Sequence, residues 1–333
     1  MEEYKNIRRL SIKGEEKDVE EILRDLNNQF SSANINFLLG SGCSSKAIEL
    51  CGNIEEEINK EQDVPKRNEK ITKFKNSIIE PHKKIKGSSI QECIRNYTNF
   101  LILIKQILSE RDNTTLPRKT NIFTTNYDLF IEHASQDIPI VLNDGFDRRK
   151  PIFQNQFKYS WEIFFNRIFT TGNIYNYKYE VPVINLIKLH GSLSWKKIGN
   201  EQNIFFDESL NSDFQGVMPT DDKYSDTVMK PILYELFRFY SNELSRENTL
   251  LISSGFSFND NHILNITKRQ LQANPTLILL IFCYKKEEKE NFKAKFNDCQ
   301  NVHIIYDNSN YIDFTDMINI LNLMLYEREY NNG

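Results

Sequence analysis

A turn rich in glycine and serine follows a short apolar segment early in the chain. Residues 35–39 are Ile-Asn-Phe-Leu-Leu, which predicts a strand, and Gly40-Ser41-Gly42-Cys43-Ser44 come next. We expect a helix to start there. A helix N-terminus binds phosphate because its unpaired N–H groups and its dipole both favour an anion. Gly40 and Gly42 would let a ligand approach the backbone, and Ser44 would cap the helix or donate to the phosphate. Alone the turn is a weak signal, because many strand-to-helix turns contain glycine.

Three more polar segments stand where predicted strands end. They are Thr124-Thr125-Asn126-Tyr127-Asp128, His190-Gly191-Ser192 and Gly255-Phe256-Ser257-Phe258-Asn259-Asp260. Each has a simpler interpretation. Asn126 and Asp128 would cap a helix, His190 would be a half-buried histidine, and a glycine would only turn the chain. In an open parallel sheet, however, the carboxyl ends of the strands border one crevice in which ligands bind. Four such segments at equivalent positions therefore predict one shared pocket.

Short apolar strands alternate with amphipathic helices along the chain. We expect strands near 35–39, 120–124, 183–189, 249–254, 276–283 and 302–306, and helices near 17–26, 90–108, 231–245, 260–272, 285–297 and 313–326. This alternation predicts βαβ units and a parallel sheet covered on both faces. The expected fold is α/β, a doubly wound Rossmann-like parallel sheet with an inserted, mainly helical smaller lobe. The expected division is an N-terminal helical segment, 1–33, and a main domain, 34–333, with lobe insertions near 50–118 and 145–180.

Composition excludes several classes of protein. The formal net charge of the 333 residues is −4, so the chain is not built to coat a phosphate backbone. The longest apolar run, residues 277–283, fits a buried strand rather than a membrane span, and the charged start lacks a signal-peptide core. The five cysteines show no C-x-x-C spacing, so neither a zinc ribbon nor a disulfide framework is expected. We therefore expect a cytoplasmic protein without bound metal.

The four segments together resemble those of sirtuins. Gly40-Ser41-Gly42-Cys43-Ser44 is similar to the sirtuin G-A-G-x-S turn, Thr124-Thr125-Asn126-Tyr127-Asp128 to T-Q-N-I-D, and Leu189-His190-Gly191-Ser192 to the catalytic H-G-S. Residues 255–263, Gly-Phe-Ser-Phe-Asn-Asp-Asn-His-Ile, resemble the G-[FY]-S-F-x-D-x-H-I element of a bacterial sirtuin-like branch associated with anti-phage defence. The motifs occur in the expected order.

Three departures from sirtuin deacylases bear on function. The region after His190-Gly191 has no counterpart of the four-cysteine zinc module. The G-x-P-D-F-R segment is replaced by Ala47-Ile48-Glu49-Leu50, and the F-G-E-type segment that pairs with an acyl-lysine peptide is missing. The resemblance therefore implies NAD binding without a peptide site.

By resemblance, NAD is the substrate. The residues assigned to binding it are Gly40, Ser41, Gly42, Ser44, Thr125, Asp128, Gly255, Phe256 and Ser257. Asp128 would bind the carboxamide, Asn126 would position a water or the ribose hydroxyls, and His190 would be the general base. Water is the expected acceptor. The predicted enzyme is an NAD+ hydrolase that releases nicotinamide and ADP-ribose.

Unregulated NAD hydrolysis in the cytosol would kill the cell, so the activity must be gated. We expect a homo-oligomer that acts as an abortive-infection effector in anti-phage defence. The resemblance implies a HerA-type DNA-translocating ATPase as one candidate partner; no direct binding to nucleic acid or membrane is expected. The N-terminal helix and the charged segment 49–75 are either contact surfaces or solvated helix faces. Two alternatives remain: a non-catalytic NAD or ADP-ribose sensor, and an NAD-dependent deacylase or ADP-ribosyltransferase.

Overall fold

The computed structural model of the protein describes most of the chain. The described residues are 6–11, 16–17, 21, 24–25, 29–30, 32–48, 50, 54–111, 116–147, 157–160, 164, 168–170, 178–180, 182–197, 204–210, 214–216 and 229–331.

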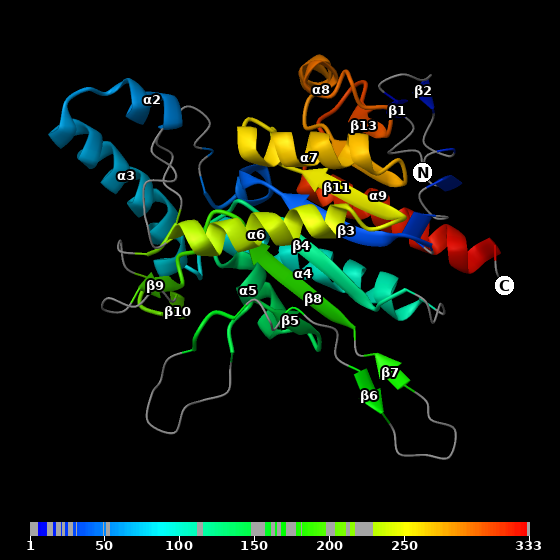
Figure 1. Ribbon diagram of the computed structural model, residues 1–333, viewed down its shortest axis with the longest axis horizontal. Coiled ribbons are helices and arrows are strands. Elements are labelled where there is room, and N and C mark those ends of the chain that lie inside the picture. Colours follow the sequence, from blue (N-terminus) through cyan, green and yellow to red (C-terminus); the bar gives the residue numbers. More distant parts are fainter. Residues whose placement is uncertain are drawn as a thin grey trace.

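A nine-stranded sheet forms the centre of the molecule, in the order β2-β1-β13-β12-β11-β3-β4-β8-β5 (Figure 1). Its strands are β1 (Ile7–Ser11), β2 (Glu16–Lys17), β3 (Asn34–Leu39), β4 (Lys119–Thr124), β5 (Val141–Asn143), β8 (Val183–Lys188), β11 (Thr249–Ser254), β12 (Leu277–Phe282) and β13 (Val302–Asp307). The seven strands from β13 to β5 are parallel to one another, whereas β1 pairs in antiparallel fashion with both β13 and β2.

The order of the strands confirms the doubly wound fold. The chain enters the sheet's centre at β3 and moves outward through β4 to β8; it then returns to β11 on the other side of β3 and continues to β12 and β13. The winding therefore reverses between β3 and β11. In such sheets the crevice at the reversal point, beyond the carboxyl ends of the strands, is where ligands bind.

Helices cover both faces of the sheet, because successive strand residues point to opposite sides. Phe37 joins one core cluster, with α4 (Ser88–Ser109), α5 (Phe130–Gln136) and α9 (Phe314–Asn331). Its neighbour Leu38 joins the other, with α6 (Met229–Leu244), α7 (Asn261–Ala273) and α8 (Lys289–Lys295), which follows the short η4 (Lys286–Glu288). The two layers are visible in Figure 1, where α6 and α7 lie in front of the strands. This burial of apolar side chains on both faces explains the continuous apolar strands of the sequence.

Two parts of the fold differ from the sequence expectation. β1 is not predicted by the charged N-terminal sequence, yet it pairs with β13 and buries Ile7. The helix expected over 17–26 lies mostly outside the described residues. Of its described residues, Lys17 belongs to the strand β2, whereas Glu21, Arg24 and Asp25 are helical. The division of the chain at residue 33 stays a prediction.

The first predicted insertion, 50–118, contains helices of two kinds. Of the insertion 50–118, α4 packs on the sheet, whereas α2 (Ile54–Lys60) and α3 (Val64–Lys83) contact each other and project from the body (Figure 1). Most of the second predicted insertion, 145–180, lies outside the described residues. Two small hairpins, β6 (Ile168–Thr170) with β7 (Lys178–Glu180) and β9 (Trp195–Lys197) with β10 (Ile204–Phe206), complete the described strands.

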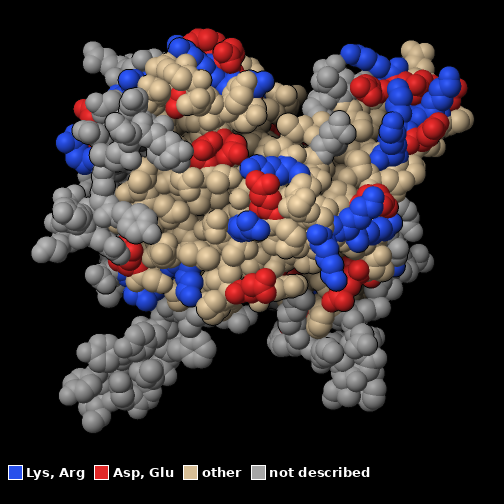
Figure 2. All heavy atoms as spheres, turned by 180° about the vertical axis from the view of Figure 1, so that it is seen from behind, with Lys and Arg blue, Asp and Glu red and all other residues tan. Residues whose placement is uncertain are grey.

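The surface carries mixed charge. On the face shown in Figure 2, Lys and Arg side chains lie next to Asp and Glu. On the projecting helices, Lys70 pairs with Glu61 at 3.0 Å and Lys83 with Glu80 at 3.0 Å. Such exposed pairs contribute little to stability. Among the described helices, we find none with the length and apolar composition that crossing a membrane requires.

A row of asparagine side chains crosses the sheet. Asn121 of β4 donates to Asn36 of β3 at 2.7 Å and accepts from Asn185 of β8 at 2.8 Å, and Asn185 accepts from Asn143 of β5 at 3.2 Å. Asn121 also donates to Glu243 of α6 at 2.9 Å. All four amides are buried, so each bond replaces water that the groups have lost. Because the register places these residues opposite one another, the row holds four strands in a single alignment.

We predict that Asn121→Ala lowers the free energy of unfolding by about 2 to 4 kcal/mol, because it removes the partner of the buried Asn36 Oδ1 and Asn185 Nδ2 and one donor to Glu243. Urea denaturation followed by circular dichroism measures the change. The exposed Asn68→Ala on α3 is the matched control, and we expect it to change stability by less than about 0.5 kcal/mol. A loss below about 1 kcal/mol for Asn121→Ala would show that the row contributes little.

Candidate functional site

The four polar segments lie side by side at one edge of the sheet. The strands that they follow, β11, β3, β4 and β8, are neighbours in that order. In the register, Leu39 is opposite both Ser254 and Thr124, and Thr124 is opposite Lys188. The last residues of the four strands therefore form one row. Backbone bonds extend this contact, since Leu189 N donates to Thr124 O at 2.8 Å and Leu193 N to Tyr127 O at 3.0 Å. The predicted grouping of the segments is thus present.

Two glycine turns interlock at the reversal point of the sheet. Gly40 N donates to Ser254 O and Gly42 N to Gly255 O, both at 3.0 Å. A Cβ on Gly40 would lie 2.3 Å from Gly255 O, and one on Gly255 would lie 2.6 Å from Cys43 N. Gly255 also has a φ of +62°, in the left-handed region that favours glycine. The glycines are thus required because one turn packs against the other, whereas the sequence analysis attributed them to the approach of a ligand.

The helix expected after the first glycine turn is a single 3-10 turn, η2 (Ser41–Ser44). The N–H groups of Gly40, Gly42 and Cys43 donate to carbonyl oxygens of the protein itself. The turn therefore continues as a short 3-10 helix, and three of its N–H groups are used within the protein. The binding of phosphate at this turn stays a prediction. Ser41 is exposed, and it is the side chain of the turn that solvent reaches most readily.

Ser44 is buried and bonds to three other side chains. Its hydroxyl donates to Asp128 Oδ2 at 2.8 Å. It then has two lone pairs, which face the Tyr97 hydroxyl at 2.9 Å and Asn126 Nδ2 at 3.3 Å. A serine hydroxyl has one donor and two acceptor positions, so this one is fully used. Ser44 does not cap this turn, because the N-cap position belongs to Gly40. Its predicted contact with phosphate stays a prediction.

Asp128 is turned inward. Its Oδ2 accepts from Ser44, and its Oδ1 accepts from Phe130 N at 3.3 Å, at the start of α5. Burial raises the pKa of the Asp128 carboxyl, while the charge of Lys188 and the bond from Ser44 act in the opposite direction. The Lys188 ammonium, itself buried, bonds to the Asp128 backbone oxygen and pairs with Glu132 Oε1 at 2.8 Å. Lys188 and Glu132 were not singled out in the sequence, because nothing in their local pattern marks a buried pair.

Asn126 carries an acceptor without a partner. Its backbone N–H donates to Thr124 Oγ1 at 3.0 Å, and its Nδ2 donates to Gly40 O at 3.0 Å and to Ser44. These bonds hold the amide in one orientation. The residue is 7% exposed, and its Oδ1 has no hydrogen-bond partner among the described residues. A buried carbonyl oxygen without a donor costs about 1–3 kcal/mol, so a ligand hydroxyl or water at this place would stabilise it.

His190 forms a pair with an acid that the sequence analysis had not assigned a role. His190 Nε2 lies 3.1 Å from Asp260 Oδ2, and the histidine side chain is 13% exposed. The turn that carries it is held by Gly191, whose φ is +87° and whose added Cβ would lie 2.4 Å from Gln215 O. Because Asp260 precedes a predicted helix, the sequence alone indicates only an N-cap. No local pattern shows that it also reaches His190.

The remaining predicted NAD-binding residues lie around the same edge. Thr125 and Phe256 are half-buried, and the Phe256 ring lies 4.9 Å from that of Phe258. Ser257 is exposed, and its carbonyl oxygen accepts from Lys295 Nζ at 2.7 Å. Among the described residues, no cluster of three or more His, Cys, Asp or Glu side chains is placed to hold a metal ion.

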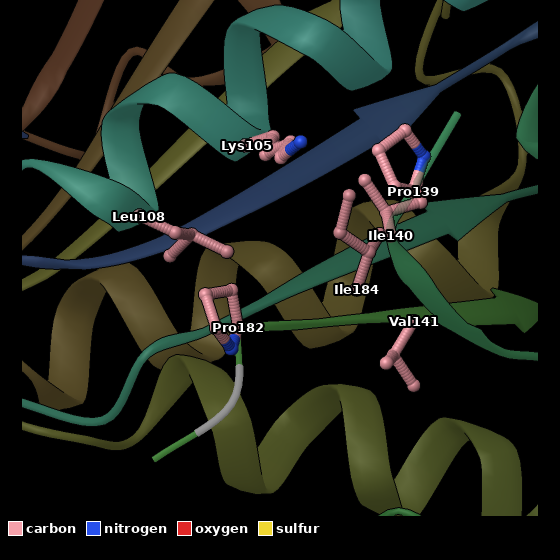
Figure 3. Close-up of a pocket in the computed structure, with 7 residues that line it drawn as sticks. All are labelled: Lys105, Leu108, Pro139, Ile140, Val141, Pro182 and Ile184. Atoms are coloured by element: carbon pink, nitrogen blue, oxygen red, sulfur yellow. The ribbon is translucent and has the colours of Figure 1, made fainter. Parts of the chain in front are cut away.

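A separate apolar cavity of about 260 Å³ lies at the other end of the strands (Figure 3). Val141 begins β5 and Pro182 directly precedes β8, so the cavity opens near the amino ends of these strands. Lys105 and Leu108 of α4 line another wall, as Figure 3 shows. The cavity therefore lies away from Asn126 and His190, which follow the carboxyl ends of β4 and β8.

The geometry defines an α/β protein with polar residues gathered at the strand ends where the winding reverses. Comparison with known proteins agrees with that class. The sequence matches the SIR2-like domain family over residues 120–304, more than half of the chain. The protein therefore belongs to the SIR2-like domain family, whose members bind NAD. No curated protein matches the sequence significantly.

A buried histidine behind the site predicts a pH dependence of stability. His82 of α3 accepts from Leu129 N at 3.3 Å, and burial, together with the charges of Lys188 and His133, lowers its pKa from 6.5 to about 3. Below about pH 6.5 the unfolded chain takes up a proton at this position that the folded protein refuses. The stability contribution is therefore complete above pH 6.5 and is lost as the pH falls towards 3.

We expect His82→Gln to flatten the fall in unfolding free energy between pH 7 and pH 5, because the amide oxygen can still accept from Leu129 N but takes up no proton. The wild-type slope contains up to about 1.4 kcal/mol per pH unit from this residue below pH 6.5. Urea titrations at several pH values measure it. His262→Gln, at an exposed position, is the control and should leave the slope unchanged. Equal slopes in wild type and His82→Gln would contradict the prediction.

Proposed function

We propose that the protein hydrolyses the bond between nicotinamide and ribose in NAD+. Water and NAD+ give nicotinamide, ADP-ribose and a proton. The proposal rests mainly on Asn126 Oδ1, a buried acceptor without a partner at the crevice edge of a SIR2-like domain. The His190–Asp260 pair beside the neighbouring strand supports it, because a histidine held by a carboxylate is suited to accept a proton.

The reaction sets two requirements for the protein. Breaking the bond leaves positive charge on the ribose, a state comparable to the oxocarbenium ion of glycoside hydrolysis. A water molecule must then attack the same carbon and lose a proton. In our proposal Asn126 Oδ1 accepts a hydrogen bond from a ribose hydroxyl or from the attacking water, and His190 takes the proton. These side chains come from the ends of β4 and β8, which pair directly.

Asp128 has an indirect role in this proposal. Both of its carboxylate oxygens bond within the protein, and the residue is 5% exposed. We therefore assign it to hold Ser44, and through Ser44 the amide of Asn126, instead of binding the carboxamide. Such support keeps a reacting group within the narrow range of positions that catalysis needs.

The pyrophosphate and the adenosine half of NAD would lie along the two glycine turns. Ser41 and Ser257 are exposed there, and they offer hydroxyl groups where the N–H groups of Gly40 and Gly42 are already used. Thr125, Phe256 and Gly255 complete the proposed contact set. The assignment of NAD to this edge follows from the family and from the rule that ligands bind at the reversal point of open α/β sheets.

We further propose that the hydrolase acts as an abortive-infection effector in anti-phage defence, and that self-assembly or a HerA-type ATPase gates it. The supporting observation is that α2 and α3 project from the body and connect to the site through Phe74, which lies 6.1 Å from Tyr127. The physical reason is that an ungated cytosolic hydrolase would deplete the NAD of its own cell.

Asn126→Ala and His190→Ala should each lower kcat for NAD hydrolysis by about 100-fold or more, because each removes a group that acts in the transition state. Chromatography of released nicotinamide measures the rate, and thermal melting confirms that the variants fold. Asn68→Ala, on the exposed side of α3, is the control with unchanged chemistry. Full activity of both site variants would refute the assigned roles. Intact NAD that stays bound to the wild-type protein would favour the sensor.

If self-assembly gates the enzyme, the turnover per milligram of protein should rise with protein concentration, because only the assembled form is active. Activity is measured over a dilution series, and light scattering gives the mass at each concentration. A monomer with constant specific activity over the whole series would exclude gating by self-assembly.

A further inference from the structure

The Asp260 carboxylate divides its two oxygens between two tasks. Oδ1 accepts from His262 N at 2.9 Å and Ile263 N at 3.1 Å, and in this way it caps the start of α7. Oδ2 faces His190 Nε2 at 3.1 Å. The side chain of Asp260 is 8% exposed, so the contact is shielded from water. A shielded carboxylate holds an imidazole more firmly than an exposed one.

The loop that carries Asp260 has a defined conformation. Phe258 has a φ of +55°, which is unfavourable for a bulky residue and persists only where the surroundings determine it. Its ring is fully buried and lies 5.0 Å from the ring of Phe296. On either side of it, Lys295 Nζ binds Ser257 O at 2.7 Å and Asn259 Oδ1 at 2.5 Å. The loop therefore presents Asp260 to His190 from a fixed position.

We propose that Asp260 is a positioning residue that holds His190 in the tautomer with hydrogen on Nε2, so that Nδ1 is the nitrogen that takes the proton. A neutral imidazole has one donor and one acceptor nitrogen, and a carboxylate accepts only. Nε2 must therefore donate to Asp260 Oδ2, and the lone pair lies on Nδ1. The inference rests on the proposed hydrolase function, in which His190 is the base.

The two tasks of the carboxylate make Asp260→Asn an unusually specific variant. The cap needs an acceptor for the N–H groups of His262 and Ile263, so the amide oxygen takes the place of Oδ1. The NH₂ group then takes the place of Oδ2 and donates to His190 Nε2. Nε2 becomes the acceptor, and the hydrogen moves to Nδ1. Asparagine is as good an N-cap as aspartate, so α7 keeps its start while the tautomer of His190 inverts.

The test compares wild type with Asp260→Asn, Asp260→Ser and the control Asp63→Asn. Serine keeps the cap but leaves His190 without a partner. Asp63 caps α3 by accepting from Lys66 N at 3.1 Å. Asp63→Asn therefore makes the same change of an N-cap aspartate to asparagine at a place away from the site. Each variant is assayed for kcat and KM with NAD, and the ring nitrogens are observed by ¹⁵N NMR. The signal of His190 is assigned by its loss in His190→Gln.

We expect Asp260→Asn to lower kcat by about 100- to 10,000-fold with KM changed less than about threefold, and to move the ring hydrogen from Nε2 to Nδ1. Asp260→Ser should lose less activity than Asp260→Asn, an order that a purely structural role for the cap would not produce. Asp63→Asn should match wild type. A kcat of Asp260→Asn within about threefold of wild type, or an unchanged tautomer, would overturn the inference.

The NMR measurement separates this inference from the proposed function. If the wild-type protein fails to cleave NAD while the tautomer still inverts in Asp260→Asn, the hydrolase proposal is wrong and the pairing of Asp260 with His190 stands. If NAD is cleaved and the tautomer does not depend on Asp260, the hydrolase proposal stands and the positioning role is wrong.

Discussion

The close contact between the two glycine turns is the constraint on which the rest of the site depends. It joins β3 and β11 where the winding of the sheet reverses, and a Cβ on Gly40 or Gly255 would enter the other turn. On one side, Gly40 O accepts from Asn126 Nδ2 and so orients that amide. On the other side, Gly255 begins the loop that delivers Asp260 to His190. The same backbone contact therefore positions both halves of the candidate site.

The polar groups around this contact are buried. Burial holds them in fixed orientations, but it costs the free energy of their lost hydration. Ser44, Asp128 and Asn126 are each less than 9% exposed, and the bonds among them replace lost contacts with water. Lys188 and Glu132 add a buried ion pair behind them. Such pairs add little net stability, but removing one partner is strongly destabilising. The stability of the site must therefore come from the apolar layers on the two faces of the sheet, which hold the strands in place.

The sequence predicted the parts of the fold that follow from periodicity. Strands such as β3 and β11 were predicted within a residue or two, because both faces of a parallel sheet are apolar. β1 was not predicted, because its charged residues conceal a strand whose pairing is with the distant β13. The site was predicted as a grouping of segments, and the strand order places those four segments next to one another. The three bonds of Ser44 and the contact of Asp260 with His190 join residues 53 or more positions apart, and no local pattern encodes such contacts.

The projecting helices are linked to the site by apolar contacts. Phe74, Ile78 and Ile79 of α3 form a core cluster with Leu193 and Phe214. Tyr127 packs against this cluster, and its ring lies 6.1 Å from Phe74, 5.8 Å from Phe214 and 6.4 Å from His190. One aromatic ring thus contacts the cluster on one side and faces the proposed base on the other. Because close-packed interiors transmit displacement, a contact that moved α3 would act directly on Tyr127, and also on Leu129, whose N–H donates to His82 of α3. The same packing that shields His190 therefore gives α3 a direct physical route to the chemistry.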